Sequence, residues 1–413
     1  MVAGGPYGLE DLIHACGYRA ALLLLLLTPL LWSLPNALMV GELASTLPAE
    51  GGYYVWVRRA LGPFLGFQEA WLSLCASVFD MAIYPTLFAL YLGRLWPAAA
   101  GGPMAIAVGV VVIAACAGNN LRGARAVGGA SEIMSLMLLL PFVVFCAMAF
   151  LAPSAVIART PGQGGENWVG GLLVAMWNFM GWDNISTVAG EVEHPQRNYP
   201  LAMVGALALV VLTYVIPVAA DARTGLAPEA WTTGFWANAG GLLGGPALAL
   251  AIVVGGMVCG LGMMDALVMS YSRLPMVMAQ DGYLPMIFAR QSKNTAAPWV
   301  SILVLSVAWS AALGFGFERL VELDVILYGL ALLLEFLALI VLRMREPDLP
   351  RPFRVPGGIA AAVLLPVGPV ALLGLAFGQG WQEHAGPRSA IAVGAALVAA
   401  GPVLYQFARR GPG

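Results

Sequence analysis

The sequence has few charged residues and few side chains that bind metals. Of its 413 residues, 10% are charged and three are histidines, whereas soluble globular proteins carry about 25% charged residues. The formal net charge of −2 gives no indication of nucleic-acid binding. The five cysteines lie in apolar runs without CxxC or metal-ligand spacing, which is typical of small hydrophobic residues in helix packing. We therefore expect no metal site, no cofactor and no nucleic-acid partner.

Long apolar blocks dominate instead, with 60% hydrophobic residues and a mean hydropathy of +0.83. Such blocks predict an all-α polytopic membrane protein embedded in the lipid bilayer. A half-helix is expected at 7–16. Eleven full spans are expected at 20–44, 63–92, 103–118, 128–152, 167–190, 200–220, 243–270, 298–316, 320–342, 358–378 and 388–407.

Basic residues are unequally divided between the two sides of this arrangement. With the loop after the half-helix placed outside, fourteen of the twenty Lys and Arg residues fall on the inner side. The positive-inside rule then predicts a multi-pass protein of the cytoplasmic membrane with a cytoplasmic C-terminus. We expect two inner loops to lie at the membrane surface, residues 53–63 with their rings at headgroup depth and the amphipathic segment 272–293.

Helix-breaking residues interrupt the apolar pattern twice. Gly4–Gly8 opens the chain as GGPYG, and the span from 167 is broken around Phe179–Gly181. Asp183 follows this second break, although an Asp at a bilayer centre costs about 2.5–3.5 kcal/mol. Five spans separate the two breaks, and an odd number inverts the second unit relative to the first. Inverted repeats that each open with a broken helix, whose breaks meet near the midplane, are a known transporter plan.

The first break would then be the middle of helix 1. On this interpretation about 15–25 apolar residues precede Met1 in an intact version, because a span needs about 20, and a chain without them lacks one wall of its cavity. The alternative is an ordinary disordered N-terminal tail, which would leave Glu10 and Asp11 in an apolar context without a reason.

Several stretches resemble a known family. GGPYGLED at 4–11, ELASTLPAEGGYYVWVRRALGPFLGF at 42–67 and GWDNISTVAGEVEHPQRNYPLA at 181–202 are similar to amino acid–polyamine–organocation transporters, as are AQDGYLPMIFARQSKNTAAPWVSI at 279–302 and REPDLPRPFRVPGG at 345–358. The polyamine-uptake branch, near the L-type amino acid transporters, is the most similar. The resemblance implies a five-plus-five inverted-repeat fold, like that of the leucine transporter, with two extra helices.

In this arrangement residues 1–342 form the transporter core, with repeats at about 1–152 and 167–342, and residues 343–413 form a cytoplasmic loop and two helices. The resemblance also implies secondary active transport of amino acids or polyamines by alternating access. A neutral or basic amino acid permease or exchanger, and a sensor that binds without transporting, remain alternatives. A membrane enzyme or channel is not expected, since nucleophile–base clusters, HExxH motifs, filter loops and charge rings are absent from the sequence.

The candidate substrate contacts are the residues of the two breaks and polar or aromatic residues predicted beside them. They are Gly4, Gly5, Pro6, Tyr7, Gly8, Asp80, Tyr84, Trp177, Asn178, Phe179, Gly181 and Asp183. The resemblance places an aromatic near Trp177 over the substrate, where a cation gains about 0.5–2 kcal/mol. Trp177 and Phe179 are also expected to gate the site, while Asn178 has the alternative role of satisfying freed backbone groups.

Acidic residues favour an amine-rich cation as substrate. Glu10 and Asp11 at a helix start would repel a carboxylate, although they can also simply compensate the helix dipole. Asp80, Asp183 and Asp265 lie in mid-span without a basic partner in the same span. If they converge on one cavity, they suit several ammonium groups or a transported proton. Each also has a structural alternative, as a cap or an interhelical hydrogen-bond partner.

The remaining candidates concern coupling and gating. They are Glu10, Asp11, Asp265, Glu335, Glu191 and Arg58. Ion pairs are expected between Glu42, Glu191 or Glu193 and Arg58, Arg59 or Arg197. Some members of the family carry a lysine in the fifth helix where others bind sodium. The corresponding span here, 128–152, contains no lysine. A coupling proton is therefore preferred to sodium.

Overall fold

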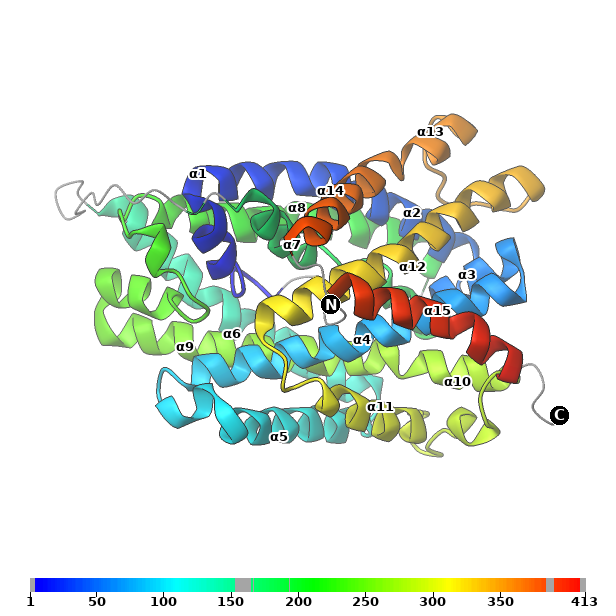
Figure 1. Cartoon of the computed structure of the whole chain (residues 1–413), viewed down its shortest axis with the longest axis horizontal. Coiled ribbons are helices and arrows are strands. Elements are labelled where there is room, and N and C mark those ends of the chain that lie inside the picture. The colour runs from blue at the N-terminus through cyan, green and yellow to red at the C-terminus, as the bar shows by residue number, and fades with distance from the viewer. Residues whose placement is uncertain (1–3, 153–164, 166, 193, 384–389, 409–413) are drawn as a thin grey trace.

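The computed structural model describes residues 4–152, 165, 167–192, 194–383 and 390–408. Within them the chain is a bundle of long helices that run along a common direction (Figure 1). The α-helices are α1 (Glu10–Thr28), α2 (Leu34–Thr46), α3 (Gly52–Leu61), α4 (Pro63–Leu92), α5 (Gly102–Asn120), α6 (Ala124–Leu151), α7 (Trp168–Asn178), α8 (Pro195–Asp221), α9 (Trp236–Tyr271), α10 (Arg273–Gln280), α11 (Trp299–Ala311), α12 (Phe317–Arg345), α13 (Gly358–Leu364), α14 (Val367–Glu383) and α15 (Ala390–Ala408).

The predicted spans correspond to helices of the structure. Among the described residues nine helical segments are long and apolar enough to cross a membrane, and the shorter apolar helices α7 and α11 occupy the two remaining predicted spans. The predicted span 63–92 coincides with α4. The fold class, an all-α polytopic transporter fold, is confirmed.

The predicted half-helix at the start of the chain is also present. Gly17 has a non-helical backbone (φ 70°, ψ 170°), so α1 consists of a short helix that begins at Glu10 and a longer one that continues toward α2. A π-helical turn at Pro29–Ser33 joins α1 to α2. Its proline lacks the N–H that an α-helical ladder would need there. In α9, Gly245 before Pro246 also has a non-helical backbone. Helical residues precede this interruption, so α9 begins at Trp236 and not at the predicted residue 243.

The two segments predicted to lie at the inner membrane surface are partly covered by protein. Tyr53, Tyr54 and Trp56 of α3 are fully buried, because α3 packs against α4 and α12. In the second segment Leu274 and Ala279 of α10 are fully buried, whereas Met286, beyond the helix, is 66% exposed. The depth of both segments in the membrane stays a prediction.

The centre of the bundle is formed by α4 and α12. They pack against each other, and α4 also packs against α9 and α3. In the most apolar stretch of each helix, 78% of the residues are buried in α4 and 67% in α12, whereas 28% are buried in α5. Polar residues on α4 and α12 are therefore held away from lipid, and they supply most acids of the candidate site.

Candidate substrate site

The two helix breaks meet inside the bundle. Gly8 lies against α7 so closely that a Cβ atom there would approach Trp177 Cζ3 to 2.9 Å and Asn178 Oδ1 to 3.9 Å. Gly8 also has φ 91° and is buried, a backbone conformation that favours glycine. The first break is therefore part of the core and not a detached tail.

Protein groups satisfy the backbone at the first break. The Gly8 N–H donates to Glu10 Oε2 at 2.7 Å, and the Leu9 N–H donates to the Pro6 carbonyl at 3.2 Å. The Pro6 carbonyl also accepts from Trp236 Nε1 at 3.0 Å. The Glu10 carboxylate thus lies at the start of α1, near the position where a helix N-terminus would otherwise hold an external anion.

The second break follows α7, which ends at Asn178. Gly181 has φ 83°, and its N–H donates to the Tyr328 hydroxyl at 3.2 Å. The same hydroxyl donates to Asp183 Oδ1, and the Asn178 carbonyl accepts from Tyr214 at 2.9 Å. The span that begins at 167 is therefore interrupted where the sequence predicted, and its continuation is a 3₁₀-helix at Asn184–Glu191.

A cavity lies between the breaks, α4, α9 and α12. Its lining, as far as the described residues form it, contains two carboxylates and no basic side chain. The lining residues are Gly4, Tyr7, Asp80, Tyr84, Leu87, Trp177, Asn178, Met180, Gly181, Asn184, Tyr214, Cys259, Met263, Leu267, Tyr271, Asp324 and Tyr328.

The two lining carboxylates differ in their hydrogen bonds. Asp80 accepts from Tyr84 at 2.8 Å and from Tyr271 at 3.1 Å. Neither oxygen of Asp324 has a hydrogen-bond partner among the described residues, although this side chain is only 1% exposed. Its charge interacts with those of Asp80 and Asp183. A buried carboxylate without a partner is costly, so Asp324 is the group of this lining that a cationic ligand would satisfy.

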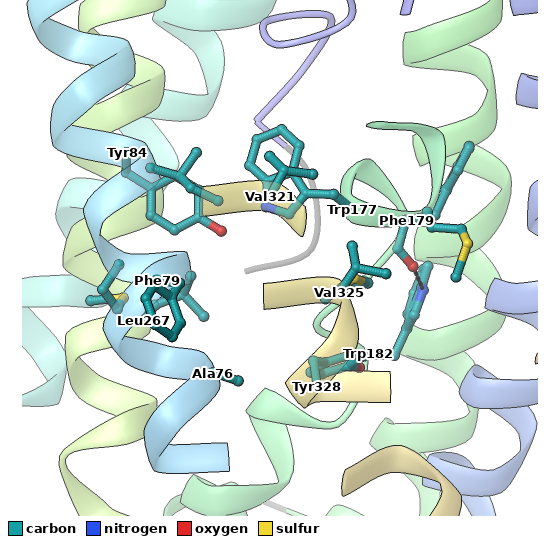
Figure 2. Close-up of a cluster of buried hydrophobic side chains, with 14 of the residues drawn as sticks. Ala76, Phe79, Tyr84, Trp177, Phe179, Trp182, Leu267, Val321, Val325 and Tyr328 are labelled. Atoms are coloured by element: carbon teal, nitrogen blue, oxygen red, sulfur yellow. Dashed lines mark hydrogen bonds between the residues drawn. The ribbon is translucent and has the colours of Figure 1, made fainter. Parts of the chain in front are cut away.

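Aromatic rings form the apolar part of the site. The rings of Tyr84 and Trp177 lie 6.3 Å apart at 33°. In Figure 2 Tyr84 projects from α4 on one side, while Phe179 and Trp182 lie on the other side of Val325. Phe179 is fully buried and packs on Tyr214 at 5.1 Å.

The structure thus places the predicted substrate contacts in two groups. The predicted contacts found in the lining are Gly4, Tyr7, Asp80, Tyr84, Trp177, Asn178 and Gly181. Those found beside it are Gly5, Pro6, Gly8, Phe179 and Asp183. Of the second group, Asp183 accepts a hydrogen bond from Tyr328, which is part of the lining. Gly5, Pro6 and Gly8 belong to the break itself. Their roles in binding stay predictions.

Of the three mid-span acids considered for one cavity, Asp80 lies in the lining and Asp183 lies beside it, whereas Asp265 has the structural alternative, an interhelical hydrogen bond. This carboxylate accepts from Asn119 at 2.8 Å and from Asn120 at 2.9 Å, away from the cavity lining. Glu10 accepts from Gly234 N at 2.9 Å and from Tyr91, in addition to Gly8.

The other coupling and gate candidates lie at different depths. Asp11 accepts from Thr233 at 2.8 Å. Glu335 is buried on α12, where its charge interacts with those of Asp183 and Glu69. The side chains of Glu191 and Glu193 lie outside the described residues.

The ion pairs differ from the predicted ones. Arg58 pairs with Asp281 at 2.7 Å, and Arg59 pairs with Glu346 at 2.6 Å. The Arg59 guanidinium, through its hydrogen bonds, lowers the pKa of Glu346 below its ordinary value. The predicted partners of these arginines were Glu42, Glu191 or Glu193, whereas Asp281 and Glu346 are more than 200 residues away along the chain.

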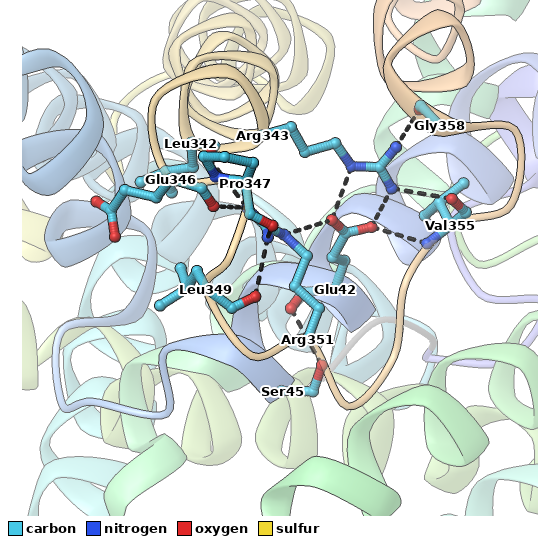
Figure 3. Close-up of polar contacts among 10 residues, drawn as sticks. All are labelled: Glu42, Ser45, Leu342, Arg343, Glu346, Pro347, Leu349, Arg351, Val355 and Gly358. Carbon is cyan, nitrogen blue, oxygen red and sulfur yellow. Dashed lines mark hydrogen bonds and ion pairs between the residues drawn. The ribbon is translucent and has the colours of Figure 1, made fainter.

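Glu42 has arginine partners that the sequence did not indicate. It is bound by Arg343 and lies 3.4 Å from Arg351, and all three side chains are at most 5% exposed. The Val355 N–H also donates to Glu42 at 2.8 Å. Figure 3 shows these groups gathered between α2 and the segment that follows α12.

Sequence reasoning missed Asp324 because it lies near the start of a span that also contains Glu318, Arg319 and Glu322. A usable signal was its spacing. Asp324 precedes Glu335 by eleven residues, and Glu69 precedes Asp80 by eleven residues. Eleven residues are close to three helical turns, so the two acids of each helix share a face.

Comparison with known proteins places this geometry in a family. The family model described as amino acid permease matches residues 1–409. Polyamine transporter RMV1 of Arabidopsis thaliana is 36% identical over 91% of this chain and 77% of its own length. Polyamine transporter PUT1 of Oryza sativa subsp. japonica is 38% identical over 90% of this chain and 70% of its own.

A more distant relative is named as an exchanger of amino acids. The serine/threonine exchanger SteT of Bacillus subtilis is 24% identical over 78% of this chain and 75% of its own length. The match over nearly the whole chain confirms the resemblance to the amino acid–polyamine–organocation transporters. The chain belongs to the amino acid permease family and is a secondary transporter of amino acids or polyamines.

Proposed function

We propose that the chain carries polyamines across the cell membrane by alternating access, together with a proton. The observation that carries this proposal is the charge of the cavity. Its lining includes Asp80 and Asp324 and, among the described residues, no lysine, arginine or histidine. A ligand with several ammonium groups would satisfy both carboxylates, because charge-assisted hydrogen bonds are about twice as strong as neutral ones.

The first helix break supports a substrate without a carboxylate. The N–H groups of Gly8 and Leu9, at the start of α1, are already bound by Glu10 and Pro6. A helix N-terminus is the usual place for the carboxylate of an amino acid in carriers with broken helices. Here such a substrate would have to displace the Glu10 side chain, whereas a polyamine would not.

The aromatic lining supports the same substrate class. Trp177 and Tyr84 present rings to the cavity, with Asp80 on the α4 side. A cation over an indole gains about 0.5–2 kcal/mol, and the methylene segments of a polyamine match apolar side chains such as Leu87 and Leu267. The site therefore alternates charge and apolar surface, as a polyamine does.

The distribution of basic residues supports an orientation. Arg58, Arg59 and Arg343 lie at the end of the bundle that holds α3 and α10, together with the segment after α12. By the positive-inside rule we place this end and the C-terminus in the cytoplasm. The ion pairs Arg58–Asp281 and Arg59–Glu346 would then close the cytoplasmic side and separate when it opens.

Uptake by proteoliposomes tests the proposal. Labelled spermidine or putrescine should enter, and unlabelled leucine or serine should not compete. Asp324→Asn should lower the affinity for spermidine by about ten- to a hundred-fold, the equivalent of one hydrogen bond to a charged group. Uptake of leucine without spermidine would instead support an amino acid permease, and binding without flux would support a sensor.

Asp221→Asn is the matched control. Asp221 is also a buried aspartate, but Tyr18 and Thr224 donate to it, at 2.7 Å and 3.2 Å. It lies outside the cavity lining. Spermidine affinity should change little in this variant, so that an equal loss in both variants would show a general defect of folding and not an ammonium site.

A further inference from the structure

A second pair of buried acids lies outside the cavity, toward the α3 end of the bundle. Asp80 on α4 and Asp324 on α12 form an aspartate pair in the lining, and Glu69 and Glu335 form a glutamate pair on the same two helices. Each glutamate is eleven residues from the aspartate of its helix, which is about 16 Å along the axis on the same face. Since α4 and α12 pack together, the four acids form two layers.

The glutamate pair is displaced toward the α3 end of the bundle. Glu69 lies near the start of α4, which follows α3 directly, and Glu335 lies in the second half of α12. The charges of Glu69 and Glu335 interact with each other and with that of Asp183. Neither glutamate lines the cavity, so a substrate amine bound to the aspartate pair does not reach them.

Among the described residues, no cation satisfies the glutamate pair. Glu69 is fully buried and Glu335 is 1% exposed. Ser73 donates to Glu69 Oε1 at 2.7 Å, but Oε2 of each glutamate has no hydrogen-bond partner among the described residues. Two ionised carboxylates in such a place would repel each other and lose their hydration without compensation. A proton bound to one of the two carboxyl groups removes the charge that causes this cost.

The surroundings of the pair favour a proton over a metal ion. The titratable groups that interact with it are Tyr53 from α3, Asp183 from the helix break and, for Glu335, Tyr328 on α12. None of these is basic. Among the described residues no cluster of His, Cys, Asp or Glu has the arrangement of a metal site.

A connection leads from the pair to the cavity. The Tyr328 hydroxyl lines the cavity, donates to Asp183 and accepts from Gly181 N. Asp183 interacts electrostatically with acids of the aspartate pair and of the glutamate pair. It therefore links the charge state of one pair to that of the other.

We propose that Glu69 and Glu335 form the site of the coupling proton, separate from the substrate site and connected to it through Asp183 and Tyr328. The proton bound to one carboxyl group holds α4 and α12 together at the α3 end. When this end opens, the O–H bond breaks, the proton passes to water there, and the two carboxylates that remain are hydrated. This proposal rests on the proposed function and names the proton site within it.

The test separates proton coupling from substrate exchange in proteoliposomes. Glu335→Gln and Glu69→Gln should exchange spermidine across the membrane at rates within about two-fold of the wild type. They should lose accumulation driven by a pH gradient by about 5- to 150-fold, the usual range of coupling between sites. Glu335→Asp, which keeps the carboxyl group, should restore part of the accumulation, and the control Asp221→Asn should keep both activities.

A second measurement does not depend on transport. Infrared spectra of the purified protein at neutral pH should contain the C=O stretch of a protonated carboxylic acid, and this band should shift or vanish in Glu335→Gln. Gradient-driven accumulation within about two-fold of the wild type in both glutamine variants would overturn the proposal, as would an unchanged infrared band in both. Absence of any spermidine flux in the wild type would overturn the proposed function instead, and the infrared result would still decide whether the pair holds a proton.

Discussion

Two groups of buried glutamates occupy the same end of the bundle and are stabilised in different ways. Glu42 is held by Arg343, Arg351 and the Val355 N–H. Glu69 and Glu335 are equally buried, yet each has an oxygen without a partner among the described residues. The cations fix Glu42 as a structural link between α2 and the segment after α12, whereas no cation among the described residues fixes Glu69 or Glu335. Burial alone therefore does not distinguish a structural acid from a functional one, and the partners do.

The largest effect is expected from removal of a cation. Arg343→Ala should lower the free energy of unfolding by about 3 kcal/mol, because it leaves Glu42 buried with only part of its compensation. Thermal unfolding of the purified protein in detergent measures this. Arg59→Ala is the control, since its pair with Glu346 is about 40% exposed on the arginine side and such pairs contribute little. Equal losses in the two variants would contradict the comparison.

Glu10 is an intermediate case, because N–H and O–H donors surround it and no cation does. Glu10→Gln should cost about 2 kcal/mol of unfolding free energy, the scale of a hydrogen bond to a charged group. The amide keeps one acceptor oxygen and must place its NH₂ group against a donor. If the variant unfolds at the wild-type temperature, the carboxylate is not the cap of α1.

Glu335→Gln should be close to neutral for stability. The change in unfolding free energy should stay below about 1 kcal/mol, because an amide replaces a protonated acid and no charge partner is lost. The same thermal measurement applies, with Arg343→Ala as the reference for a large effect. A loss as large as that of Arg343→Ala would mean that Glu335 has a cation partner after all.

The smallest effect concerns the exposed pair Arg59–Glu346 and its pH dependence. Arg59 lowers the pKa of Glu346 from its ordinary value of 4.5, so the pair adds stability above that value and loses it as the pH falls through the lowered pKa. Glu346→Gln should therefore reduce the apparent melting temperature slightly at neutral pH and not at acidic pH. A difference that is greatest at acidic pH would contradict this assignment.

Local patterns in the sequence were sufficient for the helices and for the second break. Asn178, Gly181 and Asp183 interrupt the apolar span predicted at 167–190, and the structure has a break between the end of α7 and Asn184. Similarly, the glycine-rich start predicted a buried loop, and Gly8 contacts Trp177. These features follow from short-range rules about glycine and about polar residues in apolar surroundings.

Long-range pairs were beyond such rules. Glu42 was expected to pair with Arg58, Arg59 or Arg197, yet its partner Arg343 lies 301 positions further along the chain. For Asp265 the sequence left a cavity role and an interhelical hydrogen bond open, and the amides of α5 bind it. The direction of a side chain around its helix depends on which helices pack together, and spans of nearly uniform hydropathy carry little information about that.

The contact between Glu42 and the segment after α12 has a mechanical consequence. Arg343 holds Glu42 of α2 and the Gly358 carbonyl at the start of α13. Any tilt of α2 would therefore displace the α12–α13 connection with it or break a fully buried ion pair. The segment that leads to the last helices is thereby tethered to α2, so that a force on it would be transmitted to α2.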